Sequence, residues 1–100
     1  MEPRRVVVTG LGALTPIGNT LSEYWENLLA GESGAARITY FDPELFKTQF
    51  ACELKNFDPL DHMDRKESRK YDRFAQYALV STAEALKDSN LLLNKLNKAR

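Results

Sequence analysis

A run of three valines starts the regular pattern of hydrophobic and polar positions along the chain. The valines at 6–8 are apolar on successive positions, and β-branched side chains favour strands over helices. A strand without a polar face belongs in a sheet that is covered on both sides. Gly10 and Gly12 then permit a turn or a close backbone approach, and Pro16 and Gly18 end the run. The pattern predicts a buried strand, a glycine-rich loop and a helix.

The first predicted helix has a clear beginning and end. Thr20 and Glu23 have the spacing of a capping box, in which each side chain satisfies a free backbone donor of the other residue. Gly31 is placed to end the helix in a left-handed cap. Between them, one apolar stripe follows the helical period: Leu21, Tyr24, Trp25, Leu28 and Leu29. We expect Trp25 to lie in the core or in an interface.

The longest predicted helix covers residues 73–89. Asp72 is a plausible N-cap, Lys87 suits the negative end of the helix dipole, and Asn90 can adopt the left-handed conformation that ends a helix. Small and apolar side chains spread over a broad face, which predicts a largely buried helix: Phe74, Ala75, Ala78, Leu79, Thr82, Ala83 and Leu86. After residues 91–93, which are apolar, the chain ends in a polar tail.

The segment between the two helices carries weaker signals. Residues 32–40 are expected to form a loop, and the Phe-Asp-Pro sequences at 41–43 and 57–59 are turn signals. Residues 50–54 are expected to form a short strand, and 60–63 a single helical turn. No internal repeat is visible.

Composition excludes several classes of function. Lys plus Arg equals Asp plus Glu, 14 against 14, so the chain has no excess charge that would attract nucleic acid. No run of 18 apolar residues and no signal-peptide pattern is present, which predicts neither a membrane partner nor export. Cys52 is the only cysteine, which suits a cytoplasmic protein, and we expect it to have a structural role as a small apolar residue that packs inside the fold. His62, the only histidine, is expected to be exposed or half-buried rather than a metal ligand.

The glycines at 10 and 12 invite comparison with a dinucleotide-binding turn, which also follows a strand with G-x-G. The third glycine of that fingerprint would fall on Thr15, and Pro16 follows it. Glu32, the acidic residue at a suitable distance, lies past a helix rather than at the end of a second strand. We therefore favour a structural role, in which the glycines permit tight packing of the strand against a helix.

Residues 64–73 contain five basic and three acidic side chains. One interpretation is a solvated segment with internal salt bridges. The other is a docking patch for an acidic partner, because clustered cations raise the encounter rate of an anion even on a neutral protein. The residues alone leave both interpretations open.

Four segments together resemble the N-terminus of the β-ketoacyl-acyl carrier protein synthases, most closely the synthase II type. They are V-V-V-T-G-L-G-A-L-T-P-I-G-N (6–19), W-E-N-L-L-A-G-E-S-G (25–34), F-D-P (41–43) and R-K-E-S-R-K-Y-D-R-F-A-Q-Y-A-L (65–79). The resemblance implies an α/β fold, the N-terminal part of a thiolase-like layered architecture. It also implies a homodimeric acyltransferase of fatty acid biosynthesis that elongates acyl chains by decarboxylative Claisen condensation with malonyl-acyl carrier protein.

The same resemblance assigns a partner-binding site. Lys66, Arg69 and Lys70 match the basic residues with which these synthases contact the acidic acyl carrier protein, and Arg65 and Arg73 are placed to assist. The family's catalytic cysteine and histidines match no position in these 100 residues. No catalytic residue, cofactor site or metal site is therefore expected in the chain.

The predicted elements do not supply a closed core, because two amphipathic helices and one weak strand leave the valines at 6–8 poorly covered. We expect residues 1–100 to be the N-terminal portion of a longer protein, without an internal domain boundary. An alternative from another class is a non-catalytic carrier-binding or partner subunit. A nicotinamide-dependent oxidoreductase is a third.

Overall fold

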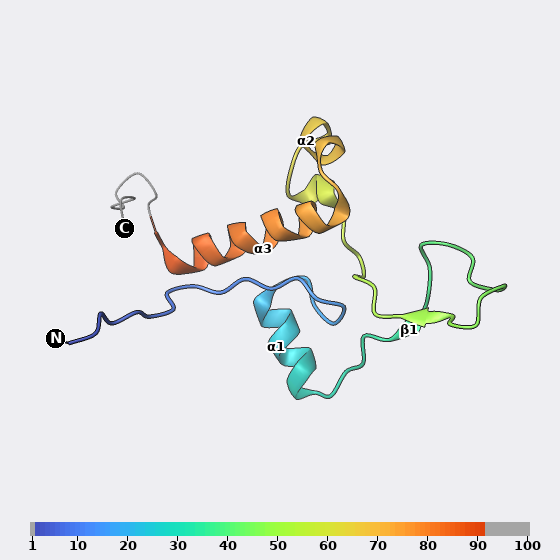
Figure 1. The fold of residues 1–100 in the computed structure, drawn as a ribbon, viewed down its shortest axis with the longest axis horizontal. Helices are drawn as coiled ribbons and strands as arrows, with labels where there is room; N and C mark the ends of the chain where they lie inside the picture. Colours follow the sequence, from blue (N-terminus) through green and yellow to red (C-terminus); the bar gives the residue numbers. More distant parts are fainter. Residues whose placement is uncertain (1, 92–100) are drawn as a thin grey trace.

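The computed structural model describes residues 2–91, which form three α-helices, one short 3-10 helix and one two-stranded sheet (Figure 1). In chain order the elements are α1 (Leu21–Leu29), β1 (Ala36–Arg37), β2 (Phe50–Ala51), η1 (Pro59–Asp61), α2 (Arg65–Lys70) and α3 (Arg73–Ser89). The predicted polar tail, residues 94–100, lies outside the described residues.

The described part of the chain, residues 2–91, is extended and has almost no core. Its principal extents are 60 × 36 × 24 Å and its radius of gyration is 17.6 Å, whereas a compact domain of this length has a radius of gyration of about 13 Å. Within residues 2–91, Val80 is the only branched aliphatic or aromatic residue that is buried, with 8% of its surface exposed. The prediction that these elements cannot build a closed core is confirmed.

The predicted buried strand at 6–8 is wrong for the described structure. The three valines lie in extended backbone without a strand partner, and Val6 is 91% exposed. The reason is physical: a strand needs the hydrogen bonds of a neighbouring strand, and the one sheet in the described part of the chain joins β1 to β2. The layered α/β architecture is therefore not present in residues 2–91.

The segment that follows the valines packs along α3, as the blue and orange-red ribbons of Figure 1 show. A Cβ atom at Gly10 would lie 2.3 Å from the carbonyl oxygen of Ala85, and one at Gly12 would lie 2.0 Å from that of Ser81. No other residue type fits such an approach. The expectation that the glycines permit close packing against a helix is confirmed.

Helix α1 begins and ends where the sequence predicts. The Thr20 hydroxyl accepts a hydrogen bond from the N–H of Glu23 at 3.2 Å, and Gly31 adopts a left-handed φ of 75°. Trp25 is 56% exposed, so the expected core position is wrong for the described part of the chain. The physical reason is that no element within residues 2–91 covers this face of the helix.

The predicted loop at 32–40 contains a strand, and the predicted strand at 50–54 is shorter than expected. β1 and β2 pair antiparallel with Ala36 opposite Ala51 and Arg37 opposite Phe50. The connecting hairpin carries the predicted Asp-Pro turn, in which the Asp42 carboxylate accepts a hydrogen bond from the N–H of Glu44. The pairing was not visible locally because β1 has no alternating pattern.

Helix α3 occupies the predicted residues, and Asn90 ends it in the left-handed conformation. The prediction that α3 is largely buried is wrong, because Phe74 is 75% exposed and the apolar face around it lines an open groove of about 580 Å³.

The predicted helical turn at 60–63 is the 3-10 helix η1. It starts one residue earlier than predicted, at Pro59, because the Asp58 carboxylate accepts a hydrogen bond from the N–H of Leu60 and caps the helix.

Candidate functional site

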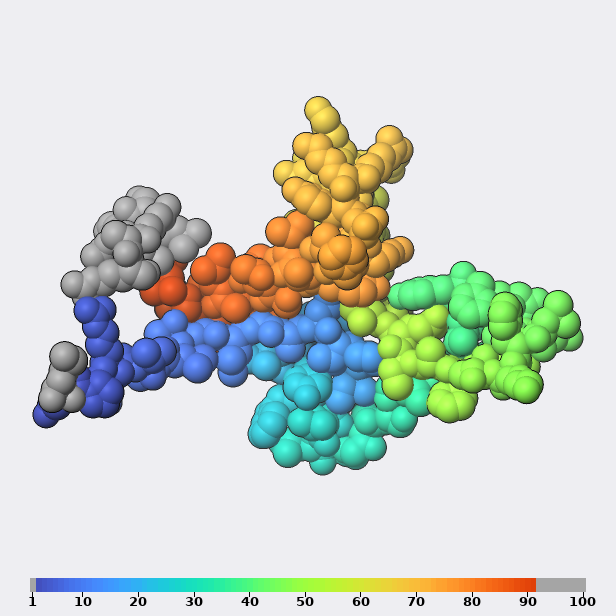
Figure 2. Space-filling view, in the orientation of Figure 1, coloured from blue at the N-terminus to red at the C-terminus, as the bar shows by residue number. Residues whose placement is uncertain are grey.

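The basic stretch of the sequence forms helix α2, which stands off the end of α3 as a separate projection (Figure 2). Asp64 caps it, since its carboxylate accepts a hydrogen bond from the N–H of Glu67 at 2.7 Å. Glu67 lies in the first turn, while Arg69 and Lys70 lie in the last turn, which is the charge order that the helix dipole favours. The local sequence therefore explains why a helix forms here.

The structure brings the three predicted docking residues together on this helix. Lys66, Arg69 and Lys70 occupy positions i, i+3 and i+4, which lie on one face of a helix, and all three are exposed. Arg65 and Arg73, the two residues placed to assist, are also exposed. The sequence placed the cations in one segment, and the helix arranges three of them side by side.

The alternative of a segment with internal salt bridges is not what the structure shows. Over residues 2–91, the single ion pair within 4.0 Å joins Arg37 to Asp42, which lie in the β-hairpin. The cations of α2 are thus available to an anionic partner. Coulomb attraction between them and a partner's carboxylates acts over about 10 Å at 0.1 M salt.

Gln76 holds the C-terminal end of α2 against α3. Its side-chain Nε2 donates to the carbonyl oxygen of Ser68 at 2.8 Å and to that of Tyr71 at 3.3 Å. It is the only buried polar side chain in the described part of the chain, with 6% of its surface exposed. Sequence reasoning missed it. The available signal was a polar residue four positions before Val80 and seven before Ala83, on an otherwise apolar stripe of α3.

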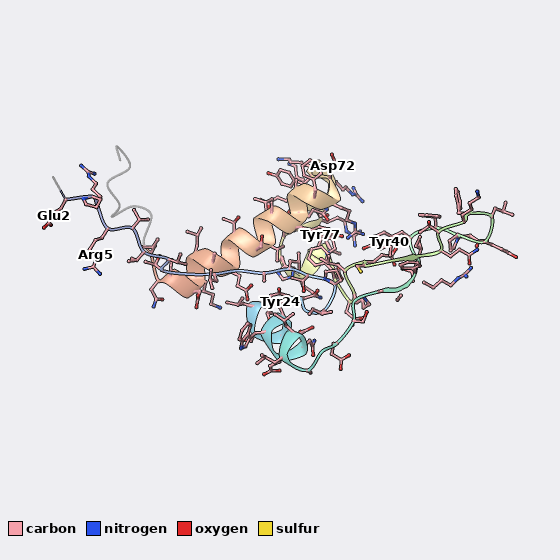
Figure 3. All side chains as sticks on the ribbon, turned by 60° about the horizontal axis from the view of Figure 1, so that its bottom comes forward. Glu2, Arg5, Tyr24, Tyr40, Asp72 and Tyr77 are labelled. Carbon is pink, nitrogen blue, oxygen red and sulfur yellow. The ribbon has the colours of Figure 1, made fainter. Side chains whose placement is uncertain are left out.

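A second polar cluster ties the β-hairpin to α3. Figure 3 shows the side chains of Tyr40 and Tyr77 approaching each other, and their hydroxyl oxygens are 3.4 Å apart. Burial raises the pKa of Tyr77 above its ordinary value of 10.0, and the hydrogen bond with Tyr40 adds to the increase. This cluster borders a cavity of about 370 Å³ that Arg73 also lines.

Glu53 anchors the same hairpin. Its carboxylate accepts hydrogen bonds from the backbone N–H and the hydroxyl of Thr39 and from the N–H of Tyr40, at 2.9–3.3 Å. Partial desolvation acts to raise the pKa of Glu53. The hydrogen bonds and the charge of Lys55 outweigh it, so the pKa lies below its ordinary value of 4.5. A carboxylate held in this way is structural rather than a proton donor.

Cys52 and His62 take part in no such cluster. Cys52 is exposed, so its expected apolar packing role is wrong in the described structure, and β2 ends one residue before it. His62 is exposed, as predicted, and its ring stacks on Phe57 with 5.6 Å between ring centroids.

Residues 2–91 contain no group of three or more His, Cys, Asp or Glu side chains with the arrangement of a metal site. Within the same residues, no helix combines the length and the apolar character of a membrane span.

Comparison with proteins of known sequence finds close relatives along the whole chain. A 3-oxoacyl-(acyl carrier protein) synthase 2 from Staphylococcus aureus is 51% identical over 94 residues, 94% of this chain and 23% of the relative. The enzyme of the same name from Synechocystis sp. is 46% identical over 97% of the chain and 23% of the relative. That from Coxiella burnetii is 49% identical over all 100 residues and 24% of the relative. The chain thus spans about a quarter of the length of the relatives it matches.

Two solved structures share its fold. The ishigamide ketosynthase/chain length factor superposes with a TM-score of 0.78 at 38% identity, over 93% of this chain and 23% of that one. A type II PKS ketosynthase in complex with its acyl-carrier protein superposes with a TM-score of 0.65 at 27% identity, over 91% of this chain and 23% of that one. The family model for the β-ketoacyl synthase N-terminal domain matches residues 3–100. The chain therefore belongs to the β-ketoacyl synthase family, in its N-terminal domain.

Proposed function

We propose that the polypeptide containing this chain is a type 2 3-oxoacyl-acyl carrier protein synthase. It condenses a carrier-bound acyl chain with malonyl-acyl carrier protein, with loss of carbon dioxide. The observation that carries this proposal is the family match over residues 3–100, together with relatives of that name at 46–51% identity. None of the 100 residues is assigned a catalytic role.

The contribution of this chain is a dock for the acyl carrier protein on helix α2. Lys66, Arg69 and Lys70 are exposed on one face, and no carboxylate in residues 2–91 lies within ion-pair distance of them. Their charge is complementary to an acidic partner, which is the character that the family resemblance gives to the carrier protein. One of the matched solved structures is a ketosynthase in complex with its acyl-carrier protein, which supports this choice of partner.

Such a dock acts mainly on the rate at which the carrier protein and the enzyme associate. Exposed charges at the rim of an interface steer diffusion and set the salt dependence of the association rate. The two chemistries on the helix are complementary, because Arg69 can bind a carboxylate with two parallel hydrogen bonds while Lys66 and Lys70 act as compact point charges. We infer that the dock lowers the KM for carrier-bound substrates and leaves the kcat of the condensation nearly unchanged.

The proposal is tested by reversing the charges of the dock in the native polypeptide with Lys66→Glu, Arg69→Glu and Lys70→Glu combined. We expect the KM for acyl carrier protein substrates to rise at least tenfold at low salt, with kcat nearly unchanged. The difference in KM between the variant and the parent enzyme shrinks as salt is added, because salt screens the same electrostatic attraction to the carrier protein that the substitutions abolish. Lys47→Glu, an exposed charge reversal in the β-hairpin, is the matched control and leaves the KM unchanged.

Two results contradict the proposal. If the triple variant keeps the parent KM at low salt, α2 is not the dock. If the parent polypeptide binds acyl carrier protein but releases no carbon dioxide from malonyl-acyl carrier protein in the presence of an acyl donor, the enzymatic assignment fails. The non-catalytic partner subunit then replaces it.

The architecture of the whole polypeptide is part of the proposal. Residues 1–100 form the first part of a thiolase-like layered α/β fold without an internal domain boundary, supported by the similarity to two ketosynthase structures. The proposal also places the whole polypeptide in the cytoplasm as a homodimer. The family resemblance supports the dimer, and the single cysteine suits a reducing compartment.

A further inference from the structure

Gln76 makes a contact that the docking charges alone do not explain. Its amide nitrogen binds the carbonyl oxygens of Ser68 and Tyr71, which are the residues immediately before and after the pair Arg69 and Lys70. Both docking residues of the last turn are therefore held between two anchored carbonyls. The Gln76 side chain is 94% buried, so water does not compete effectively for these hydrogen bonds.

Helix α2 needs such an anchor. It has six residues, whereas isolated helices shorter than about 12–15 residues are marginal in water. The carbonyls of its last turn have no partners inside the helix. The buried amide binds one of them, that of Ser68, and also the carbonyl of Tyr71, the C-cap residue that directly follows the helix. The rest of the junction with α3 is loosely packed, since a cavity of about 200 Å³ lies between Glu67 on α2 and Val80 on α3.

We propose that Gln76 is a positioning residue for the docking helix: it orients Arg69 and Lys70 toward the acidic carrier protein by capping the C-terminal end of α2. This rests on the proposed function, because it requires α2 to be the dock. The other end of the amide contributes nothing to the anchor, since the buried Oε1 has no hydrogen-bond partner in the described part of the chain. The positioning role thus belongs to the two N–H donors of Nε2.

The test is Gln76→Met in the native polypeptide, a change that keeps the length of the side chain and its charge but removes both donors. We expect the affinity for acyl carrier protein to fall about tenfold, which corresponds to about 1.4 kcal/mol. All cations remain, so the slope of log affinity against log salt stays close to that of the parent. Hydrogen exchange of the α2 amides becomes faster.

Two further variants separate positioning from general stability. Gln49→Met is the matched control, because the Gln49 amide also donates to two loop carbonyls, those of Glu44 and Phe46, but in the β-hairpin away from α2. It leaves carrier affinity unchanged. Val80→Ala weakens packing at the same α2–α3 junction without touching the α2 carbonyls, and we expect it to lower the melting temperature while affinity falls less than twofold.

The outcomes distinguish this inference from the proposed function. If Gln76→Met binds carrier protein like the parent while charge reversal on α2 weakens binding, the positioning role is overturned and the dock stands. If Val80→Ala loses as much affinity as Gln76→Met, Gln76 acts through stability alone and the inference is also overturned. If charge reversal itself has no effect, the proposed dock fails.

Discussion

Single polar side chains hold together segments that are far apart in the sequence. The Glu84 carboxylate accepts hydrogen bonds from the N–H groups of Ala13 at 2.8 Å and Leu21 at 3.0 Å, and Asp88 accepts one from the N–H of Leu11 at 3.0 Å. Glu84 and Asp88 lie one turn apart on α3, so one face of this helix receives both the extended segment and the start of α1. The side chain of Lys55 likewise donates to three backbone carbonyls.

The carboxylate of Glu53 gives a prediction that depends on pH. Its pKa is lower in the folded chain than its ordinary value of 4.5, so its hydrogen bonds stabilise the hairpin fully above pH 4.5. This contribution is lost as the pH falls through the lower, folded-state pKa. We expect the Thr39 amide proton to move upfield over that window, as followed by NMR in the native polypeptide.

The matched variant for this prediction is Glu53→Gln, whose side chain keeps an acceptor oxygen but does not titrate. The chemical shift of the Thr39 amide proton should then show no titration below pH 4.5. An unchanged titration in Glu53→Gln would assign the effect to another carboxylate.

At the scale of elements, the helices are defined by their ends more than by their apolar faces. Asp64 and Asp72 occupy equivalent positions before α2 and α3, and both have extended backbone conformations. Only Asp64 makes a side-chain capping hydrogen bond. The short helix α2 therefore depends on its cap, whereas α3, with 17 residues, does not.

This difference predicts unequal effects of the same substitution. Asp64→Ala should cost α2 about 1 kcal/mol, the usual value of an N-cap, and hydrogen exchange of the Ser68 amide should accelerate about fivefold. Asp72→Ala is the control and should change exchange in α3 by less than twofold. An acceleration of less than twofold in Asp64→Ala would show that the Asp64 hydrogen bond does not stabilise α2.

At the scale of the whole molecule, the described chain lacks the buried apolar surface of an independent domain. Its long axis is 60 Å, the apolar face of α3 is open, and the valines at 6–8 are exposed. Net hydrogen-bond contributions of about 0.5–1.5 kcal/mol each do not offset the backbone entropy of about 1–2 kcal/mol per ordered residue. Burial must supply the difference, and residues 2–91 supply little.

We therefore predict that an isolated polypeptide of residues 1–100 shows no cooperative thermal transition. By calorimetry its heat capacity should rise gradually without a peak, and the amides of residues 6–8 should exchange at the rate of an unfolded chain. In the native polypeptide the same amides should be protected, because the valines are then paired in the sheet of the proposed fold. A sharp transition of the isolated chain with protected valine amides would overturn this prediction.

Sequence by itself determined the features that depend on neighbouring residues. The ends of α1 and α3, the left-handed Gly31 and Asn90, and the Asp-Pro turn were all predictable, because caps and turns are set by side chains within a few positions. The assignment of Lys66, Arg69 and Lys70 as proposed docking residues came from family resemblance. Their placement on one helix face required the observed α2, since six charged and polar residues carry no apolar period.

Only the tertiary structure decided the contacts between distant segments. The pairing of β1 with β2 and the close approach of Gly12 to α3 join residues that are far apart in the sequence. Gln76 and Ser68 are only eight residues apart, but no local pattern connects the Gln76 amide to the α2 carbonyl that it binds. The physical reason is that their geometry depends on where other elements lie rather than on intrinsic preference. For the same reason the valines at 6–8 have the composition of a buried strand and yet lie exposed, because a strand exists only where a partner strand is present.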